Sequence, residues 1–224
     1  GGAGDHDIYV ATRASVDVPF GSPIALKDLN TSDFETSAAI SLDGLTLWFG
    51  SDRPDGEGGV DIYVSTRASR TEPWRAPLPV AELNSADDQI PRPPGARGLV
   101  MPMALRKKDS SERYNNYFST RTSLDGRWGD PIALPLLTGQ PSHDADGFLS
   151  DDGLTFCFKS DRDGTQDIFI STRPSLAASW STATPVTELN TDAAEGDPWM
   201  SPDGHVVYFA SDRSGDSRIY RAER

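Results

Sequence analysis

A unit of just over fifty residues repeats along this chain, and this repeat limits the possible folds more than any other feature. The good copies contain a Ser-x-Asp-Gly turn, an apolar strand, a Ser-Asp-Arg turn and a second strand; they lie at 41–67, 150–173 and 201–220. A degraded copy lies at 98–121 and half a copy at 7–13. The second strands begin at Asp7, Asp61, Asn115, Asp167 and Arg218, which are 54, 54, 52 and 51 residues apart. Such a period is typical of solenoids and propellers.

Each period is predicted to hold four short strands. Leu154 to Lys159 alternates apolar with smaller or polar residues between two Asp- and Gly-containing turns, as a strand of a hairpin does. Between hairpins, an aromatic residue and a proline introduce another apolar strand, in segments 20–35, 74–89, 128–137 and 180–195. A lone hairpin cannot bury its apolar faces, so the copies must pack together. Four antiparallel strands per repeat indicate the blade of a β-propeller.

The Ser-x-Asp-Gly turn, the aromatic-rich strand, Ser-Asp-Arg and Asp-Ile-Tyr or Asp-Ile-Phe resemble the WD-like propeller repeats of the TolB family. The resemblance covers nearly the whole chain. It implies a β-propeller that serves either as a protein-binding platform in the bacterial periplasm or as the propeller in front of a prolyl-peptidase-type hydrolase. It therefore also implies a periplasmic, cell-surface or secreted location.

We predict one all-β domain over residues 1–224, with units at 1–34, 35–88, 89–143, 144–194 and 195–224. Four blades are expected, closed by pairing of the chain ends, because closure removes exposed sheet edges. The strand in Ser22–Leu29 would become the fourth strand of the C-terminal blade, which leaves the strand Asp7–Thr12 as a surplus. That surplus strand could pair with a second copy of the protein. The alternative is that the chain is part of a five- or six-bladed propeller.

The composition argues against a nucleic-acid partner and against a transmembrane helix. Acidic residues outnumber basic ones by 34 to 21, a net charge of −13, so nucleic acid would be repelled. No apolar run approaches the roughly 20 residues of a transmembrane helix.

The single cysteine, Cys157, is expected to be a buried core thiol and can form no intrachain disulfide. Three tryptophans, Trp128, Trp180 and Trp199, are expected in the cores between blades.

One candidate binding site follows from the repeat. The position six residues before the Ser of each Ser-x-Asp-Gly turn, or its equivalent in the degraded copy, holds Glu35, Gln89, Asp144 and Glu195. These residues begin the innermost strands, so we predict a ring at one mouth of the channel. Carboxylates held together raise one another's pKa or bind a cation. No cofactor is predicted, unless a divalent cation such as calcium occupies this ring; the alternative is that each side chain accepts hydrogen bonds from backbone groups.

Two further features involve basic residues. The degraded copy concentrates positive charge in an otherwise acidic protein, at Arg97, Arg106, Lys107, Lys108 and Arg113. These five are a candidate patch for an acidic partner or another copy of the protein; drift on a solvated face would give the same pattern. In the regular copies, the arginine of Ser-Asp-Arg is predicted to pair with the Asp that begins the next strand, as Arg53 with Asp61 and Arg162 with Asp167.

Motifs for catalysis are not found in the sequence, which contains no G-x-S-x-G nucleophile elbow, no H-E-x-x-H and no Walker phosphate loop. We therefore predict a non-catalytic binding or scaffold module of an exported bacterial protein, which engages a peptide, a protein segment or a small ligand at the channel mouth. The alternative is a propeller with glycoside-hydrolase-like activity, or the accessory propeller of a peptidase. An adjoining catalytic domain would favour that alternative.

Overall fold

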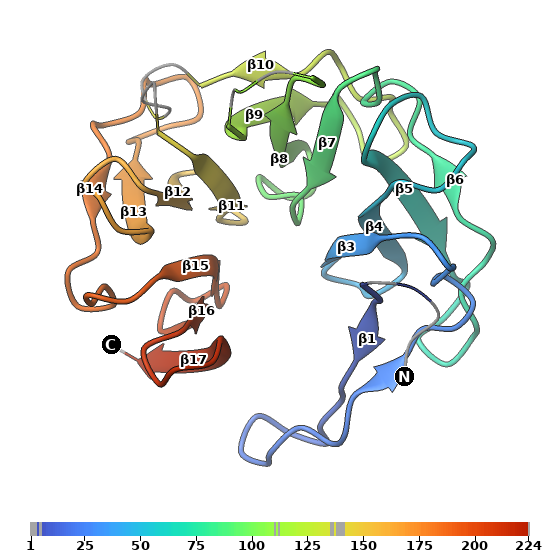
Figure 1. The fold of residues 1–224 in the computed structure, drawn as a ribbon, viewed down its shortest axis with the longest axis horizontal. Coiled ribbons are helices and arrows are strands. Elements are labelled where there is room, and N and C mark those ends of the chain that lie inside the picture. The colour runs from blue at the N-terminus through green and yellow to red at the C-terminus, as the bar shows by residue number, and fades with distance from the viewer. Residues whose placement is uncertain are drawn as a thin grey trace.

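The computed structural model describes residues 4, 6–109, 111, 113–134, 137 and 142–223, which form four propeller blades and an N-terminal half-blade arranged in an arc (Figure 1). Blade 1 contains β3 (Glu35–Ile40), β4 (Thr46–Ser51), β5 (Asp61–Thr66) and β6 (Leu78–Pro79). Blade 2 contains β7 (Asp88–Pro91), β8 (Val100–Arg106), β9 (Asn115–Thr120) and β10 (Ile132–Ala133). Blade 3 contains β11 (Asp144–Leu149), β12 (Thr155–Ser160), β13 (Asp167–Thr172) and β14 (Thr184–Pro185). Blade 4 contains β15 (Glu195–Met200), β16 (Val206–Ser211) and β17 (Arg218–Glu223), and the half-blade contains β1 (Tyr9–Val10) and β2 (Ile24–Ala25).

The predicted all-β, four-bladed propeller is confirmed. Every blade is an antiparallel sheet whose strands follow one another in chain order, and the first strands, β3, β7, β11 and β15, lie on the inner side of the arc (Figure 1). In each segment between hairpins, the strand that follows the aromatic residue (β2, β6, β10 or β14) is only two residues long. Its proline at β6 and β14 suits an outer edge, where not every backbone N–H is needed in the ladder.

The Ser-x-Asp-Gly turn is held by its own side chains. In blade 1, the Ser41 hydroxyl donates to Asp43 and accepts from the Thr46 N–H, while Asp43 also accepts from the Leu45 N–H at 2.9 Å. The hydrogen bond from Ser41, followed by that from Leu45, lowers the pKa of Asp43. Gly44 closes the turn in the left-handed region, with φ of 74°, which an L side chain adopts only with strain. The same turn recurs at Ser150 and at Ser201.

The arginine that follows the third strand of blades 1, 2 and 3 fixes the aromatic residue that comes next. Arg67 donates to the Gly44 carbonyl at 2.8 Å and stacks over Trp74 with its guanidinium 4.3 Å from the ring centroid. The equivalent pairs are Arg121 with Trp128 and Arg173 with Trp180. One side chain thus joins the inner turn, the third strand and the outer segment of its blade.

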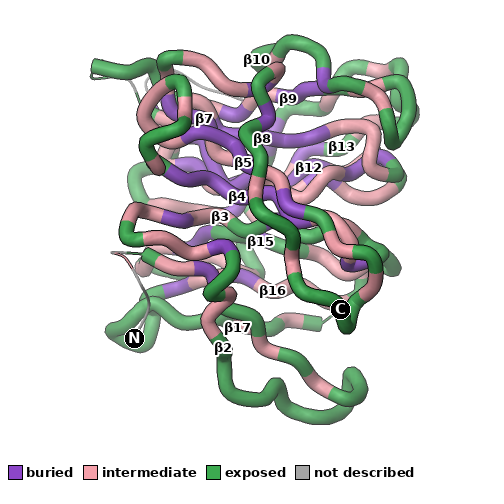
Figure 2. Tube along the Cα trace, turned by 90° about the vertical axis from the view of Figure 1, so that its right-hand side faces the viewer, coloured by how far each residue is buried: buried purple, intermediate pink, exposed green. Residues whose placement is uncertain are grey.

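Apolar side chains fill the spaces between adjacent blades, and burial is concentrated in the strands of blades 1 to 3 (Figure 2). Trp128 of blade 2 is buried against Trp48, Val80 and Leu83 of blade 1. Trp180 of blade 3 packs on Phe118 of blade 2. The expectation that these tryptophans belong to the inter-blade cores is confirmed for Trp128 and Trp180, but it is wrong for Trp199, whose exposed fraction is 38%.

The predicted pairing of the two chain ends is not formed in this structure. β2 pairs with β1, with Tyr9 opposite Ala25, and no described strand continues blade 4 beyond β17. The local hairpin forms instead because Arg13 stacks on Phe20 and Ile8 packs on Phe49 and Tyr63 of blade 1. The surplus strand of the sequence prediction is thus β1, held on blade 1, and a larger ring stays a prediction. None of the described residues forms a helix that is long and apolar enough to span a membrane.

Candidate functional site

The four predicted ring residues are all buried. Their side chains bond groups of their own blade or of the loop that leads into it, while their backbone N–H groups bond carbonyls of the preceding blade or half-blade. Glu35 accepts hydrogen bonds from the Thr31 N–H at 2.8 Å, the Thr31 hydroxyl at 2.7 Å, the Ser51 hydroxyl at 3.0 Å and Arg53 at 3.1 Å. Glu195 has the same set of donors from Thr191, Ser211 and Arg213. These carboxylates are therefore compensated by protein donors, mostly side chains, which removes the physical reason for expecting a cation between them.

The arginine of Ser-Asp-Arg pairs across the blade rather than along its own hairpin. Arg53 bonds Glu35, Arg162 bonds Asp144 at 2.8 Å and Arg213 bonds Glu195 at 3.0 Å. The predicted pairs of Arg53 with Asp61 and Arg162 with Asp167 are thus wrong. The chain leaves β4 in a direction that carries the guanidinium back over Phe49 and Tyr63, toward the start of β3.

Asp61 has a different role. Its Oδ2 accepts the N–H groups of Glu57 and Gly58 at 2.7 and 3.0 Å, and so closes the loop that precedes β5. The sequence does carry a signal for the observed ion pairs, because acid and arginine are separated by 18 residues in each one.

Blade 2 differs in a way that explains its degraded sequence. Gln89 replaces the carboxylate and bonds Ser85 through its Nε2 at 2.6 Å. The ion pair is displaced by one residue, with Arg106 donating to Asp88 at 2.8 Å and stacking over Tyr114. The same separation of 18 residues is kept. Blade 2 therefore retains the pair that braces the other blades, at a neighbouring position.

Metal binding finds no support among the described residues, where no group of three or more His, Cys, Asp or Glu side chains is arranged to hold an ion. The role of Glu35, Gln89, Asp144 and Glu195 in ligand binding stays a prediction. Their contacts identify them as structural residues of the blades.

A network of charged side chains that the sequence analysis missed crosses the interior of the arc. Arg92, just after β7, pairs with Asp146 of blade 3 and with Asp197 of blade 4, the latter at 2.9 Å. Lys159 of β12 also pairs with Asp146, at 2.5 Å. We call Arg92, Asp146, Lys159 and Asp197 the central network. The repeat contains a signal for it, because both acids stand two residues after a predicted ring residue.

The backbone at these two acids is left-handed. Asp146 and Asp197 have φ of 57° and 48°, and Ser37 at the equivalent position of blade 1 has φ of 52°. The strand register shifts at the same point in each of the three blades. A bulge of this kind redirects a side chain, and here it accompanies the two acids that bond Arg92.

The candidate basic patch does not form one surface. Arg97 precedes β8 and Arg106 ends it, so a strand of roughly 20 Å separates them. Arg106 is paired with Asp88, and Arg113 with Asp161 of blade 3. Lys107 and Lys108 are exposed beside Arg106, and the Lys108 N–H donates to Asp87. The positive charge of this copy is thus largely used within and between blades.

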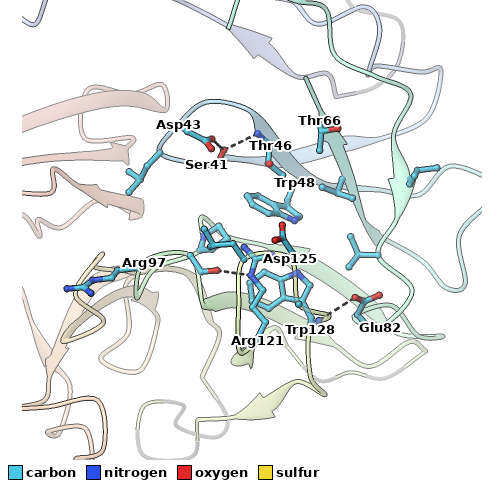
Figure 3. Close-up of a pocket in the computed structure, with 18 of the residues that line it drawn as sticks. Ser41, Asp43, Thr46, Trp48, Thr66, Glu82, Arg97, Arg121, Asp125 and Trp128 are labelled. Carbon is cyan, nitrogen blue, oxygen red and sulfur yellow. Dashed lines mark hydrogen bonds between the residues drawn. The ribbon is translucent and has the colours of Figure 1, made fainter. Parts of the chain in front are cut away.

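A groove of about 860 Å³ lies between blades 1 and 2; we call it the blade 1–2 groove. Trp48 and Trp128 face each other across it, and the side chain of Arg97 extends away from both indoles (Figure 3). Val64 and Val80 complete the apolar floor. The backbone N–H of Trp128 donates to the Glu82 carboxylate at 3.3 Å (Figure 3), so the outer loop of blade 2 is tied to blade 1.

The rim of the groove combines exposed leucines with carboxylates. Leu42, Leu78 and Leu124 are 67%, 66% and 62% exposed. The acids at the groove are Asp43, Glu82, Asp125 and Asp151, and its basic residues are Arg97 and Arg121. Asp151 has a buried Oδ1 with no hydrogen-bond partner in the described structure. An apolar floor with convergent polar groups is the usual build of a binding site.

Comparison with solved structures identifies the fold. The chain matches a putative TolB from Agrobacterium tumefaciens with a TM-score of 0.57 and 20% identity, over 90% of this chain and 62% of that one. It matches TolB from Acinetobacter baumannii with a TM-score of 0.57 and 17% identity, over 90% of this chain and 43% of that one. Its fold is that of the TolB β-propellers. The chain spans less than two thirds of the length of either TolB.

A further structure with the same type of fold is the periplasmic gluconolactonase PpgL of Pseudomonas aeruginosa, with a TM-score of 0.50 and 11% identity, over all of this chain and 81% of that one. No protein-family model and no curated protein sequence matches the chain. At these identities the comparisons establish the TolB-like fold, and the site must be argued from its own residues.

Proposed function

We propose that this TolB-like propeller is a non-catalytic binding module that takes a peptide segment of a protein partner in the blade 1–2 groove. The observation that carries the proposal is the groove itself, which combines two facing indoles with three exposed leucines along its rim. Large exposed apolar side chains grouped around a hollow are typical of interaction sites. An open groove of this size accommodates several side chains of an extended peptide.

Charge complementarity favours a peptide that carries basic residues. Four carboxylates line the groove against two arginines. Arg121 already donates to the Gly98 carbonyl and stacks on Trp128, and Arg97 extends away from the indoles. The net charge of −13 would also steer a basic segment toward the protein.

The groove lies at the opposite end of the innermost strands from the predicted ring. Glu35 begins β3, and Ser41, which follows its last residue, lines the groove. The structure thus supports a different binding position from the channel mouth of the sequence prediction. A periplasmic location is part of the proposal, and the likeness of fold to a periplasmic gluconolactonase supports it weakly.

Selection from a random peptide library on phage, followed by calorimetry, tests this function. We expect selected peptides to combine aromatic or aliphatic residues with lysine or arginine. Leu42→Asp and Leu124→Asp should each weaken the binding of the selected peptides by at least about tenfold, because the new carboxylate would be buried against an apolar side chain of the peptide.

Leu176→Asp is the matched control. Leu176 of blade 3 is 59% exposed and covers Gly153, as Leu124 covers Gly98, but it does not line the groove. Peptides whose binding falls equally in Leu176→Asp and Leu124→Asp, or a library that yields no binder, would reject the groove as the binding site.

A further inference from the structure

The turn at residues 95–98 of blade 2 is equivalent to the Ser-x-Asp-Gly turns of the other blades, and Arg97 takes the place of their aspartate. The Gly98 N–H donates to the Gly95 carbonyl at 2.9 Å, as the Gly44 N–H donates to the Ser41 carbonyl at 2.8 Å. In blades 1, 3 and 4 the aspartate accepts hydrogen bonds within its own turn. These aspartates are Asp43, Asp152 and Asp203. An arginine has no acceptor, so Arg97 cannot close its turn in this way.

The backbone of the blade 2 turn adopts a conformation that its residues disfavour. Ala96 and Arg97 have φ of 50° and 57°. Two consecutive left-handed residues are the mark of a type I′ turn, where glycine, asparagine and aspartate are the usual residues. The N–H groups of Ala96 and Arg97 donate to the Ser150 and Asp151 carbonyls of blade 3, at 3.1 and 2.8 Å. These two bonds hold the backbone of Arg97 in a fixed position where blades 2 and 3 meet.

The guanidinium of Arg97 is free to bind a ligand. Arg97 is exposed and lines the blade 1–2 groove, and its side chain has no hydrogen-bond or ion-pair partner among the described residues. Arg121, the other arginine of the groove, donates instead to the Gly98 carbonyl at 2.9 Å and stacks over Trp128. The fork of N–H donors on a guanidinium matches the two oxygens of a carboxylate. Arg97 thus offers a preformed position for a carboxylate.

The opposite end of the groove is acidic. Arg97 and Glu82 lie on opposite sides of the facing indoles of Trp48 and Trp128 (Figure 3). Glu82 accepts the backbone N–H of Trp128 through Oε1, and its Oε2 lies 3.9 Å from the exposed Arg127. A carboxylate has about four lone-pair sites, so Glu82 can accept a further donor. The groove therefore has a positive end, an apolar middle and a negative end.

We propose that Arg97 determines which way a peptide lies in the blade 1–2 groove, because it binds a carboxylate of the peptide while a lysine or arginine of the peptide reaches Glu82. This role rests on the proposed function of the groove and adds to it the class of partner: a segment with an acidic group, apolar residues and a basic residue, in that spatial order. A peptide lying the other way would bring like charges together at both ends of the groove. The carboxylate is an acidic side chain or the C-terminus of the peptide.

Calorimetry with peptides selected on the parent protein tests this role. Each peptide is synthesised with its acidic residues intact or replaced by the corresponding amides, and with a free or an amidated C-terminus. We expect Arg97→Ala to weaken the peptide that has the bound carboxylate about three- to fivefold, as an exposed ion pair allows. The same variant should leave the affinity of the form without that carboxylate unchanged, and the form that shows this identifies the carboxylate as a side chain or as the C-terminus.

Charge reversal gives a larger effect. Arg97→Glu should weaken the peptide by at least about tenfold, because attraction becomes repulsion. A peptide in which lysine replaces the acidic group should regain affinity for Arg97→Glu. Lys108→Glu is the matched control: Lys108 is exposed beyond the far end of β8, its replacement changes the net charge equally, and it does not line the groove. Circular dichroism and thermal melting check the folding of each variant.

The outcomes separate the role of Arg97 from the function of the groove. Equal weakening by Arg97→Glu and Lys108→Glu would show that net charge governs binding and would overturn the role of Arg97. Binding that is weakened by Leu124→Asp but unaffected by Arg97→Ala and Arg97→Glu would also overturn it, while the groove remains the binding site. Binding that is unaffected by all of these variants would reject the groove itself.

Discussion

Replacing Arg53 by alanine should unfold blade 1 more readily than any surface substitution, because it leaves a charge stranded in the core. The Glu35 side chain has no exposed area, and that of Arg53 is 10% exposed. Without Arg53, Glu35 keeps the donors of Thr31 and Ser51, so its charge is only partly compensated. The variant also loses a bond to the Leu29 carbonyl at 2.9 Å and the stacking on Phe49 and Tyr63.

The expected loss in the free energy of unfolding is about 3 kcal/mol. Breaking one side of a buried ion pair costs roughly 3–5 kcal/mol, and the donors left around Glu35 place this case at the lower end. Arg70→Ala is the matched control, since Arg70 is exposed and its side chain donates to the carbonyls of Leu42 and Asp43. An exposed arginine of this kind contributes about 0–1 kcal/mol.

Urea denaturation followed by tryptophan fluorescence measures both variants. The double variant Glu35→Gln/Arg53→Ala should regain part of the loss, because the neutral amide needs no cation, as Gln89 shows in blade 2. Equal urea midpoints for Arg53→Ala and Arg70→Ala, or no recovery in the double variant, would refute the argument that a stranded buried carboxylate dominates.

Three further substitutions or reactions test the remaining contacts. Burial alone would raise the pKa of Glu195, but the hydrogen bonds from its neighbours together lower that pKa below the ordinary 4.5. The stability that ionised Glu195 contributes is therefore present above pH 4.5 and lost as the pH falls through the lowered pKa. Glu195→Gln should flatten the acid side of the curve of stability against pH, and an unchanged curve would contradict this. Asn116 is buried with both amide atoms unpartnered in the described structure, at the place where blades 1 and 3 have Ile62 and Ile168. Asn116→Ile should raise the free energy of unfolding by about 1–3 kcal/mol, measured as a higher urea midpoint. A lower midpoint would show that the amide has a partner. Burial raises the pKa of the Cys157 thiol to about 12, so a thiol reagent should label it slowly at pH 8 and quickly in urea, whereas rapid labelling of the native protein would show that the thiol is accessible.

The repeat predicts the strands well because each strand begins at a fixed place in it. β5, β9, β13 and β17 begin at Asp61, Asn115, Asp167 and Arg218, as the period indicates. β7 begins one residue before the predicted Gln89, at Asp88, where blade 2 has displaced its ion pair. The period thus predicts where the strands of each blade begin, because the turns that bound these strands are formed by residues close together in the sequence.

Side-chain partners were harder to predict because they depend on how the chain turns after a strand. The pair of Arg53 with Asp61 follows from closeness in sequence, but the backbone after Ser51 directs the guanidinium to Glu35 instead. Binding sites between blades were missed for a related reason. The groove needs Trp48 of one repeat and Trp128 of another to face each other, and the period says which positions are equivalent, not which ones meet across an interface.

Arg92 has a consequence for how the molecule unfolds. In repeat proteins each unit usually contacts only its neighbours, so stability is nearly a sum of local terms and terminal units open independently. Arg92 of blade 2 reaches Asp197 of blade 4 past blade 3, a contact between residues 105 positions apart. Opening blade 4 therefore weakens the support of an arginine that also holds blade 3 through Asp146. Blades 2 to 4 should open together in hydrogen exchange, as one cooperative unit, while the half-blade, which packs on blade 1 through Ile8, exchanges on its own.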